Sequence, residues 1–323
     1  MASLKEIKGR IASVRSTLKI TSAMKLVASA KLRKAQTAIG SMVPYQQGLQ
    51  RILLDLTAGA PLRPKAPVFP EPAVVPAPEA VAELDVPADP WEEVKPVPPL
   101  EVALLCFSSN SSLCGAFNAN VIREATKAVR EYEAAGMKVT VWSVGRKMAD
   151  AMRKLGYPSP QDLTHLSGHP TYAEAADLAQ VLIEGFEEGR FVKVELIYNH
   201  FKSTASQPTL RETYLPRPGD LTAVEPDPTR PDIPEQIVEG EEFIIEPDRQ
   251  TQIDLLLPKV QRLKIYTVLL DTVAAEHAAR TVAMQTATDN GEDLLQQLTL
   301  EYNKSRQAKI TAEILDLEGG TLE

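Results

Sequence analysis

Residues 7–42 read IKGRIASVRSTLKITSAMKLVASAKLRKAQTAIGSM. Apolar residues recur in steps of four and three, a spacing that places them on one face of a helix that packs against another helix. Two polar residues interrupt the series. The spacing predicts one long helix over residues 3–57, bent or broken near Gly40 and Pro44. The expected seam consists of Ile7, Ile11, Val14, Leu18, Thr21, Lys25, Ala28, Leu32, Ala35, Ile39 and Met42.

A second helical pattern begins near Pro247-Asp248 and continues to about Leu317. We expect Pro258 to kink it. At 1.5 Å per residue the two helices would be on the order of 80 Å and 90–100 Å long, and they need a packing partner to be stable in water. We therefore expect them to form an antiparallel coiled coil. The second seam is Val260, Leu263, Thr267, Leu270, Ala274, His277, Thr281, Met284, Thr288, Gly291, Leu295, Leu298 and Tyr302.

Between these helices, residues 100–216 alternate strand and helix patterns. That order predicts a mostly parallel sheet covered by helices. The fold class is therefore α/β, with long terminal helices and a central Rossmann-like domain. The expected strands are 100–107, 138–144, 191–201 and 209–215, with a short fifth at 243–245, and the expected helices are 118–135, 146–155 and 172–189.

Two proline-rich stretches separate these parts. Twelve prolines lie between Pro61 and Pro99, a composition that sustains neither helix nor sheet. Residues 216–246 are again rich in proline and acidic residues. The predicted organisation is a coiled-coil helix over 1–59, a Pro-rich insertion over 60–99, a central α/β domain over 100–246 and a C-terminal coiled-coil helix over 247–323.

The charge of the chain is uneven along its length. The first 57 residues contain ten Lys or Arg and two acids, which gives them a net charge of +8. Since the whole chain has a net charge of −8, residues 58–323 carry a net charge of −16. A basic arm on an acidic body implies a partner for the arm. Two cysteines in 323 residues, Cys106 and Cys114, make no disulfide framework and indicate a reducing compartment.

No apolar run approaches the roughly 18 residues that a membrane span needs. The N-terminus has charges but no apolar segment typical of a secretory signal. A mitochondrial transit peptide is the alternative, because the first fifty residues are basic and amphipathic. The sequence thus predicts a protein that is soluble or peripheral to a membrane.

Ser108–Asn118, SSNSSLCGAFN, follows the first strand, where α/β sheets commonly bind ligands. A phosphate cradle is one interpretation, but the stretch has neither G-x-G-x-x-G nor G-K-[ST]. We favour a capped strand-to-helix turn. His165 and His169 are four residues apart but flank Gly168, so a surface turn is favoured over a metal site.

We predict no catalytic residue, cofactor or metal, because His200 and His277 have no nucleophile nearby in the sequence. A nucleic-acid-binding patch on the first helix would use Lys25, Lys31, Arg33 and Lys34. The acidic remainder of the chain and the lack of accompanying aromatic residues argue against it.

Three stretches carry a family resemblance. Residues 11–31, IASVRSTLKITSAMKLVASAK, resemble the N-terminal helix of the gamma subunit family of F-type ATP synthases. Residues 276–313, EHAARTVAMQTATDNGEDLLQQLTLEYNKSRQAKITAE, are similar to the C-terminal signature of that family. The loop around residues 113–115 resembles the family's SD-x-GLCG motif.

The sequence departs from these motifs at three positions. Asn110 and Ser112 stand where the family usually has Asp and Gly, and Thr281 stands where it usually has Met. The Pro-rich segment 60–99 has no usual counterpart. The redox cysteine pair of chloroplast members is not visible, which points to a bacterium.

The resemblance implies a non-catalytic rotor shaft that couples proton flow to ATP synthesis on the beta subunits and regulates ATPase activity. One such chain stands inside three alpha and three beta subunits, and also meets the epsilon subunit and the membrane ring of c subunits. The implied location is the cytoplasmic face of a bacterial inner membrane, peripherally bound. The implied contacts with beta are Met24, Lys25, Arg306 and Gln307, and the implied bearing tip is Ile310, Ile314 and Leu317.

Two other classes of protein predict different behaviour. A nucleotide-binding enzyme with helical extensions would need a phosphate loop, which the sequence lacks. A coiled-coil scaffold or nucleic-acid-binding stalk would show salt-sensitive binding to DNA or RNA. Neither class accounts for the two terminal signatures.

Overall fold

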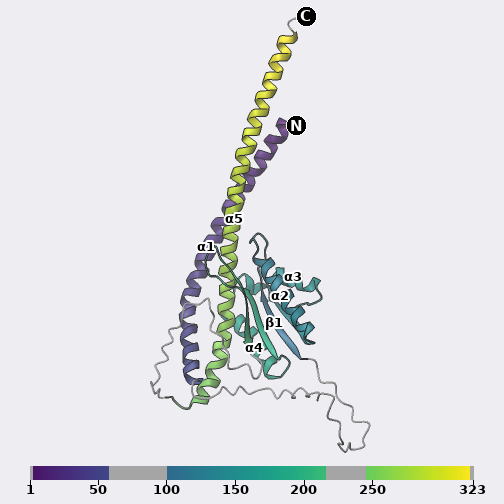
Figure 1. Cartoon of the computed structure of the whole chain (residues 1–323). Helices are drawn as coiled ribbons and strands as arrows, with labels where there is room; N and C mark the ends of the chain where they lie inside the picture. The colour runs from purple at the N-terminus through teal and green to yellow at the C-terminus, as the bar shows by residue number, and fades with distance from the viewer. Residues whose placement is uncertain (1–2, 58–99, 216–244, 321–323) are drawn as a thin grey trace, which may run out of the picture.

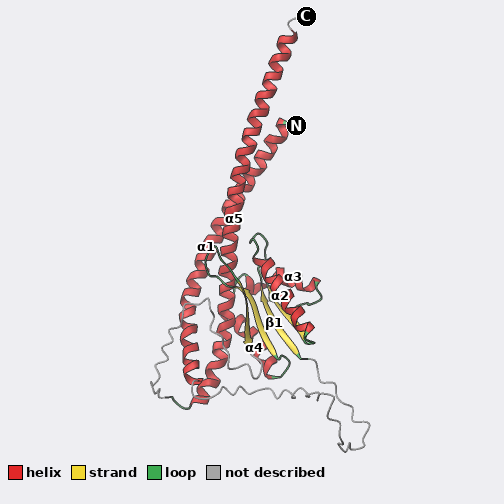
Figure 2. Ribbon diagram, viewed as in Figure 1, coloured by secondary structure: helices red, strands yellow, loops and turns green. Residues whose placement is uncertain are grey.

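The computed structural model describes residues 3–57, 100–215 and 245–320, with the backbone alone for Leu54, Thr57 and residues 316–320. Helix α1 (Leu4–Thr57) and helix α5 (Arg249–Gly320) dominate it. They lie side by side and antiparallel, and both chain ends lie toward the same end of the rod (Figure 1). An α/β body packs against the other half of α5, as Figure 2 shows by secondary structure.

Both long helices form, and neither is broken at its internal proline. Helix α1 continues through Gly40 and Pro44 for 54 residues, and α5 continues through Pro258 for 72 residues. Pro44 is exposed, on the side of α1 away from the packed seam. Packing along a whole face stabilises a helix by more than one proline costs it, so the break does not occur.

The helix starts follow ordinary capping chemistry. The backbone N–H of Glu6 donates to the Ser3 hydroxyl at the start of α1. At the start of α5, the N–H of Thr251 donates to Asp248 Oδ1 at 2.9 Å. These oxygens satisfy donors that the first helical turn leaves unpaired. The predicted start near Pro247-Asp248 is confirmed within two residues.

Burial follows the predicted seams. All of the predicted seam positions of α1 and all of those of α5 are buried or half-buried. Ile7 is 1% exposed near the beginning of α1, and Leu32 and Ala35 form a buried cluster with Ala274 and Ala278 of α5. The step of four and three residues therefore identified the packed face of each helix.

The two helices approach each other closely at one level. The hydroxyl of Thr288 donates to the hydroxyl of Thr21 at 3.0 Å, a polar pair in an otherwise mostly apolar seam. One turn further along, a Cβ on Gly291 would lie 2.7 Å from Cδ2 of Leu18. A larger residue here would therefore force the Leu18 side chain to move, and the polar pair favours this register of the two helices.

The sheet of the α/β body has the order β2-β1-β3-β4. The three strands β1 (Glu101–Phe107), β2 (Lys138–Val144) and β3 (Lys193–Asn199) are parallel, and β4 (Thr209–Leu215) pairs with β3 antiparallel. The predicted mostly parallel sheet is therefore confirmed. Two strands have the predicted bounds, but Ile245 lies outside any strand, and residues 243–244 lie outside the described residues.

Helices cover both faces of this sheet. One face packs on α2 (Phe117–Ala134) and α3 (Arg146–Lys154) around Leu104 and Cys106. The other packs on α4 (Tyr172–Glu187), on α5 and on a short 3₁₀ turn, η1 (Thr164–Ser167), which the sequence pattern did not predict. Helix α5 contributes three side chains to this second core, Ile265, Val268 and Leu269.

Replacing Gly291 by Val tests the close approach of the helices. Because the new side chain meets Leu18, we expect the free energy of unfolding to fall by roughly 1–3 kcal/mol, the usual range for overpacking. Gly48→Val in α1 is the matched control, because no atom lies within 4 Å of its Cβ position. Thermal unfolding followed by circular dichroism should separate the two variants, and equal melting temperatures would contradict this account of Gly291.

Candidate functional site

The loop after β1, the strongest candidate for a ligand site, is filled by its own side chains. Asn110 Oδ1 accepts from the N–H of Arg146 at 2.9 Å, and Ser108 Oγ accepts from the N–H of Met148 at 2.9 Å. These N–H groups begin α3, where an anion would otherwise bind. A Cβ on Gly145 would lie 2.2 Å from the Ser108 carbonyl oxygen, so the backbone leaves no room there.

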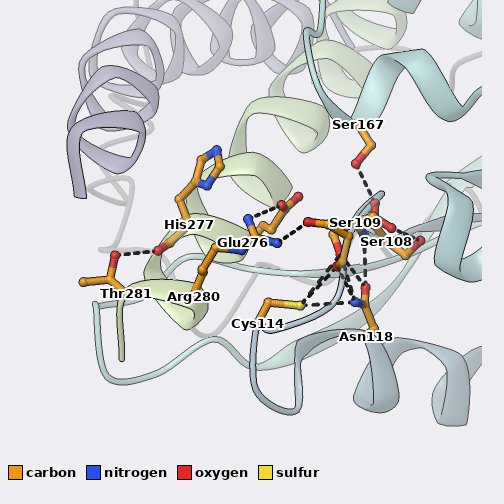
Figure 3. Close-up of polar contacts among 10 residues, drawn as sticks. Ser108, Ser109, Cys114, Asn118, Ser167, Glu276, His277, Arg280 and Thr281 are labelled. Atoms are coloured by element: carbon orange, nitrogen blue, oxygen red, sulfur yellow. Dashed lines mark hydrogen bonds and ion pairs between the residues drawn. The ribbon is translucent and has the colours of Figure 1, made fainter. Parts of the chain in front are cut away.

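Side chains of the loop and of the start of α2 also bond to one another (Figure 3). Asn118 accepts from the N–H of Ser109 at 3.0 Å and donates to Cys114 Sγ at 3.1 Å. Cys114 is 1% exposed. These contacts close the turn, which supports the capped-turn interpretation over a phosphate cradle.

Two of the three departures from the motifs, Asn110 and Thr281, make hydrogen bonds within the fold. The Asn110 side chain also donates from Nδ2 to the Thr164 carbonyl at 2.8 Å, which a carboxylate in its place could not do. At the other departure, the Thr281 hydroxyl donates to the His277 carbonyl at 2.8 Å, within α5.

The two histidines have different surroundings. His165 lies 3.4 Å from the Glu174 carboxylate, and His169 is exposed. Among the described residues, no group of three His, Cys, Asp or Glu side chains could hold a metal ion. His200 instead contacts Asp271 of α5 through Nδ1, at 2.6 Å.

A buried polar cluster joins α5 to the α/β body, and the sequence patterns did not predict it. Arg280 pairs with Glu276 at 2.6 Å and donates to the Ser111 hydroxyl at 2.8 Å, and the residues 276 and 280 are only 7% and 8% exposed. Burial raises the pKa of the Glu276 carboxyl, and the Arg280 guanidinium opposes that shift. A buried charge pair of this kind must be fully bonded to be tolerated.

His277 lies beside this cluster, on the side of α5 that faces α1. Burial lowers the pKa of its imidazole to about 4, and the positive charges of Arg280 and Lys31 act in the same direction. Within the described residues its Nδ1 has no hydrogen-bond partner. The ring is therefore neutral at pH 7.

The residues that the family resemblance implies lie at two separate levels of the rod. Met24 and Lys25 are half-buried, close to the polar Thr21–Thr288 pair. Extending the register of that pair places the start of α1 beside about residue 305 of α5, because both helices rise equally per residue. Arg306 and Gln307 thus lie beyond α1, about 30 Å from the first pair along the axis, and the structure does not bring the two pairs together.

Beyond that point α5 continues alone. Every side chain from Arg306 to Leu315 is exposed, including Ile310 at 44% and Ile314 at 51%. The backbone of Leu317 is helical, and its side chain lies outside the described residues. The tip of α5, from Arg306 onward, is therefore a helix that does not pack on α1 and whose described apolar side chains are exposed to solvent.

Comparisons with known proteins agree over the full length. A family model described as ATP synthase matches residues 3–322. The ATP synthase gamma chain of Phocaeicola vulgatus is 48% identical over 323 residues, with all of both chains covered. That of Flavobacterium johnsoniae is 38% identical, with 99% of this chain and 98% of the relative covered.

The chain belongs to the ATP synthase gamma chain family. It is accordingly a central-stalk subunit, and it is non-catalytic, since the catalytic sites of the enzyme lie on its beta subunits. Among solved structures, the chain is similar to one of the Euglena gracilis mitochondrial ATP synthase, with a TM-score of 0.57, 19% identity, and 99% and 93% of the two chains covered. One of the Tetrahymena thermophila mitochondrial ATP synthase, its central stalk and c-ring, gives a TM-score of 0.51 at 19% identity.

Those structural likenesses establish the fold alone, because the identities are low. Within the described part of this gamma chain, none of the helices is both long enough and apolar enough to cross a bilayer.

His277 generates a prediction about pH. Its pKa is about 4 when folded and 6.5 for an ordinary imidazole, so the unfolded chain binds the proton more readily. The stability that the neutral ring supplies is present above pH 6.5 and is lost as the pH falls through 4.

We therefore expect His277→Gln to lose less stability than the parent between pH 7 and pH 4.5, measured by urea unfolding. His169→Gln, at an exposed histidine, is the control and should follow the parent. If the stability of all three proteins changes equally with pH, His277 does not contribute to the pH dependence of stability.

Proposed function

We propose that α1 and α5 form an antiparallel coiled coil that turns inside a ring of three alpha and three beta subunits. The observation that carries this proposal is the tip of α5, which remains helical beyond the start of α1 with its side chains exposed. A single helix of about fifteen residues is marginal in water, so a surrounding sleeve would have to stabilise it.

The side of α1 that faces away from α5 supports the same arrangement. Ile20, Leu26 and Val27 are between 57% and 71% exposed, near the middle of the rod. The same helix carries all of the net charge of +8 found over the first 57 residues. Apolar and basic groups on one outer surface suit a sleeve that offers both apolar contacts and carboxylates.

The coupling would follow from symmetry. One rod inside a threefold ring cannot make identical contacts with three identical subunits. Each beta subunit would meet a different face of the rod and take a different conformation, because one protein shifts the conformation of another only through differential contact free energy. Rotation would then pass each beta subunit through all of these states.

Specific contacts are assigned to this scheme by position. Arg306 and Gln307 would bind a beta loop near the tip, where a guanidinium can hold a carboxylate through two hydrogen bonds. Met24 and Lys25 would contact beta subunits at the lower level. Ile310, Ile314 and Leu317 would turn in an apolar bearing.

The α/β body, which we regard as Rossmann-like from its three parallel strands with helices on both faces, would lie outside the ring. There it would meet the epsilon subunit and the ring of c subunits. The whole assembly would be peripheral to the cytoplasmic face of a bacterial inner membrane. We propose no nucleic acid, metal or cofactor as a partner.

Reconstitution tests the scheme as a whole. Alpha and beta subunits from the same source would be mixed with and without this chain, and complex mass and Mg-ATP hydrolysis would be followed. We expect one copy of this chain per three alpha–beta pairs and a sharp rise in turnover. If no complex forms and turnover is unchanged, the assignment of these partners is wrong.

The Arg306 and Gln307 assignment has its own test in the complete enzyme. Replacing both by Ala removes hydrogen bonds to a charged partner, typically about 1.5–3 kcal/mol each. We expect proton pumping per ATP to fall while assembly is retained. Lys309→Ala, in the same exposed segment, is the control, and normal coupling in the double variant would remove these residues from the proposed contact.

A further inference from the structure

Helix α5 is enclosed over part of its length, and this enclosure is the starting observation. From Val260 to Thr281 every residue is buried or half-buried. Ala274 and Ala278 face α1, whereas Ala275 packs against Cys114 and Phe117 of the α/β body. The body and α1 together surround the helix at this level.

Two polar contacts between α5 and the body lie in the half of this stretch nearest the tip, beyond those of Gln261, Arg262 and Lys264. At one, Asp271 accepts from the N–H of Phe201 at 2.9 Å and from His200 Nδ1 at 2.6 Å, both in the connection between β3 and β4. At the other, Arg280 donates to Ser111 in the loop after β1. Asp271 and Arg280 are each 8% exposed.

The two contacts approach α5 from opposite sides. Residues 271 and 280 are nine positions apart, which is two and a half turns at about 3.6 residues per turn. Their side chains therefore leave the helix in opposite directions, and they meet different loops of the same sheet edge. Figure 3 shows the Arg280 side of this arrangement, with Glu276 holding the guanidinium in place.

The loops that receive these contacts are themselves held in place. The Ser111 carbonyl accepts from the hydroxyl of Ser109 at 2.6 Å, and Asn199, beside His200, donates to the Phe117 carbonyl at 3.0 Å. Neither loop can yield easily when the helix turns. The packing of Ile265, Val268 and Leu269 already holds the helix to the sheet. The two contacts on opposite sides add resistance to rotation in both directions at the end of the body nearest the tip.

We propose that Asp271 and the Arg280–Ser111 pair act as positioning residues that make the α/β body turn together with α5. We call these two contacts the torque anchor. This proposal rests on the proposed function, in which rotation passes between the catalytic head and the membrane sector. The anchor acts only under load, because an unloaded shaft transmits little torque through the body.

The test uses the complete enzyme in inverted membrane vesicles, comparing the parent, Asp271→Asn, Ser111→Ala and the double variant. ATP hydrolysis is measured with an uncoupler, and ATP-driven proton pumping without one. In the double variant we expect uncoupled hydrolysis to match the parent and protons pumped per ATP to fall at least about twofold, because each lost hydrogen bond weakens the grip on the helix. Each single variant should show a smaller loss than the double, since one side of the anchor remains.

Asp177→Asn makes the same change at an exposed position on α4 and should pump like the parent. Normal pumping in an assembled double variant would overturn the anchor. So would a double variant in which hydrolysis and pumping fall in the same proportion, since that marks a merely structural defect. If the double variant does not assemble, the two single variants provide the test. Normal proton pumping by both overturns the proposal. Fewer protons pumped per ATP by both, with uncoupled hydrolysis unchanged, supports it.

Failure of the anchor is distinct from failure of the proposed function. In the first case, the variants assemble and couple fully. In the second, even the parent chain neither joins the alpha and beta subunits nor raises their turnover.

Discussion

The packing of α5 between Val260 and Thr281 is the constraint on which the remaining structure depends. On one side the helix completes the core of the sheet, through Ile265, Val268 and Leu269. On the other it supplies the seam for α1, through Ala274 and Ala278. Without α5, α4 would be the only long helix described on that face of the sheet, and α1 would have no apolar partner. One helix therefore belongs to both the rod and the body.

Much of this architecture was predictable because it depends on patterns of residues that are close together in the sequence. The step of four and three residues identified the buried face of each long helix, and strands were expected at 138–144 and 209–215 with the bounds that the structure shows. The double use of α5 was not predicted, because the seam pattern accounts for one face only. Consecutive apolar residues at Val268, Leu269 and Leu270 were the available signal, since a helix that is apolar on several sides is buried on several sides.

Other features depend on residues far apart in the chain. Arg280 and Ser111 are separated by 169 positions, and Asp271 and His200 by 71, so no local pattern could pair them. A break near Gly40 and Pro44 would reflect intrinsic helix propensity, which packing over the full seam overrides. The contact residues at Met24, Lys25, Arg306 and Gln307 came from resemblance alone, and the structure adds their level on the rod and their exposure.

The unequal lengths of α1 and α5 have a further consequence for how firmly each part of the chain is held. Where α5 is surrounded, opening its backbone would expose two cores at once, so amide hydrogens there should exchange with solvent only when the whole protein unfolds. Toward the tip the helix first loses the body and then α1, and each loss removes one set of buried contacts. The chain thus carries a gradient of local stability along a single helix. Its firmest point lies inside the body, and its loosest lies at the end, where the order of the last turns depends on whatever surrounds them.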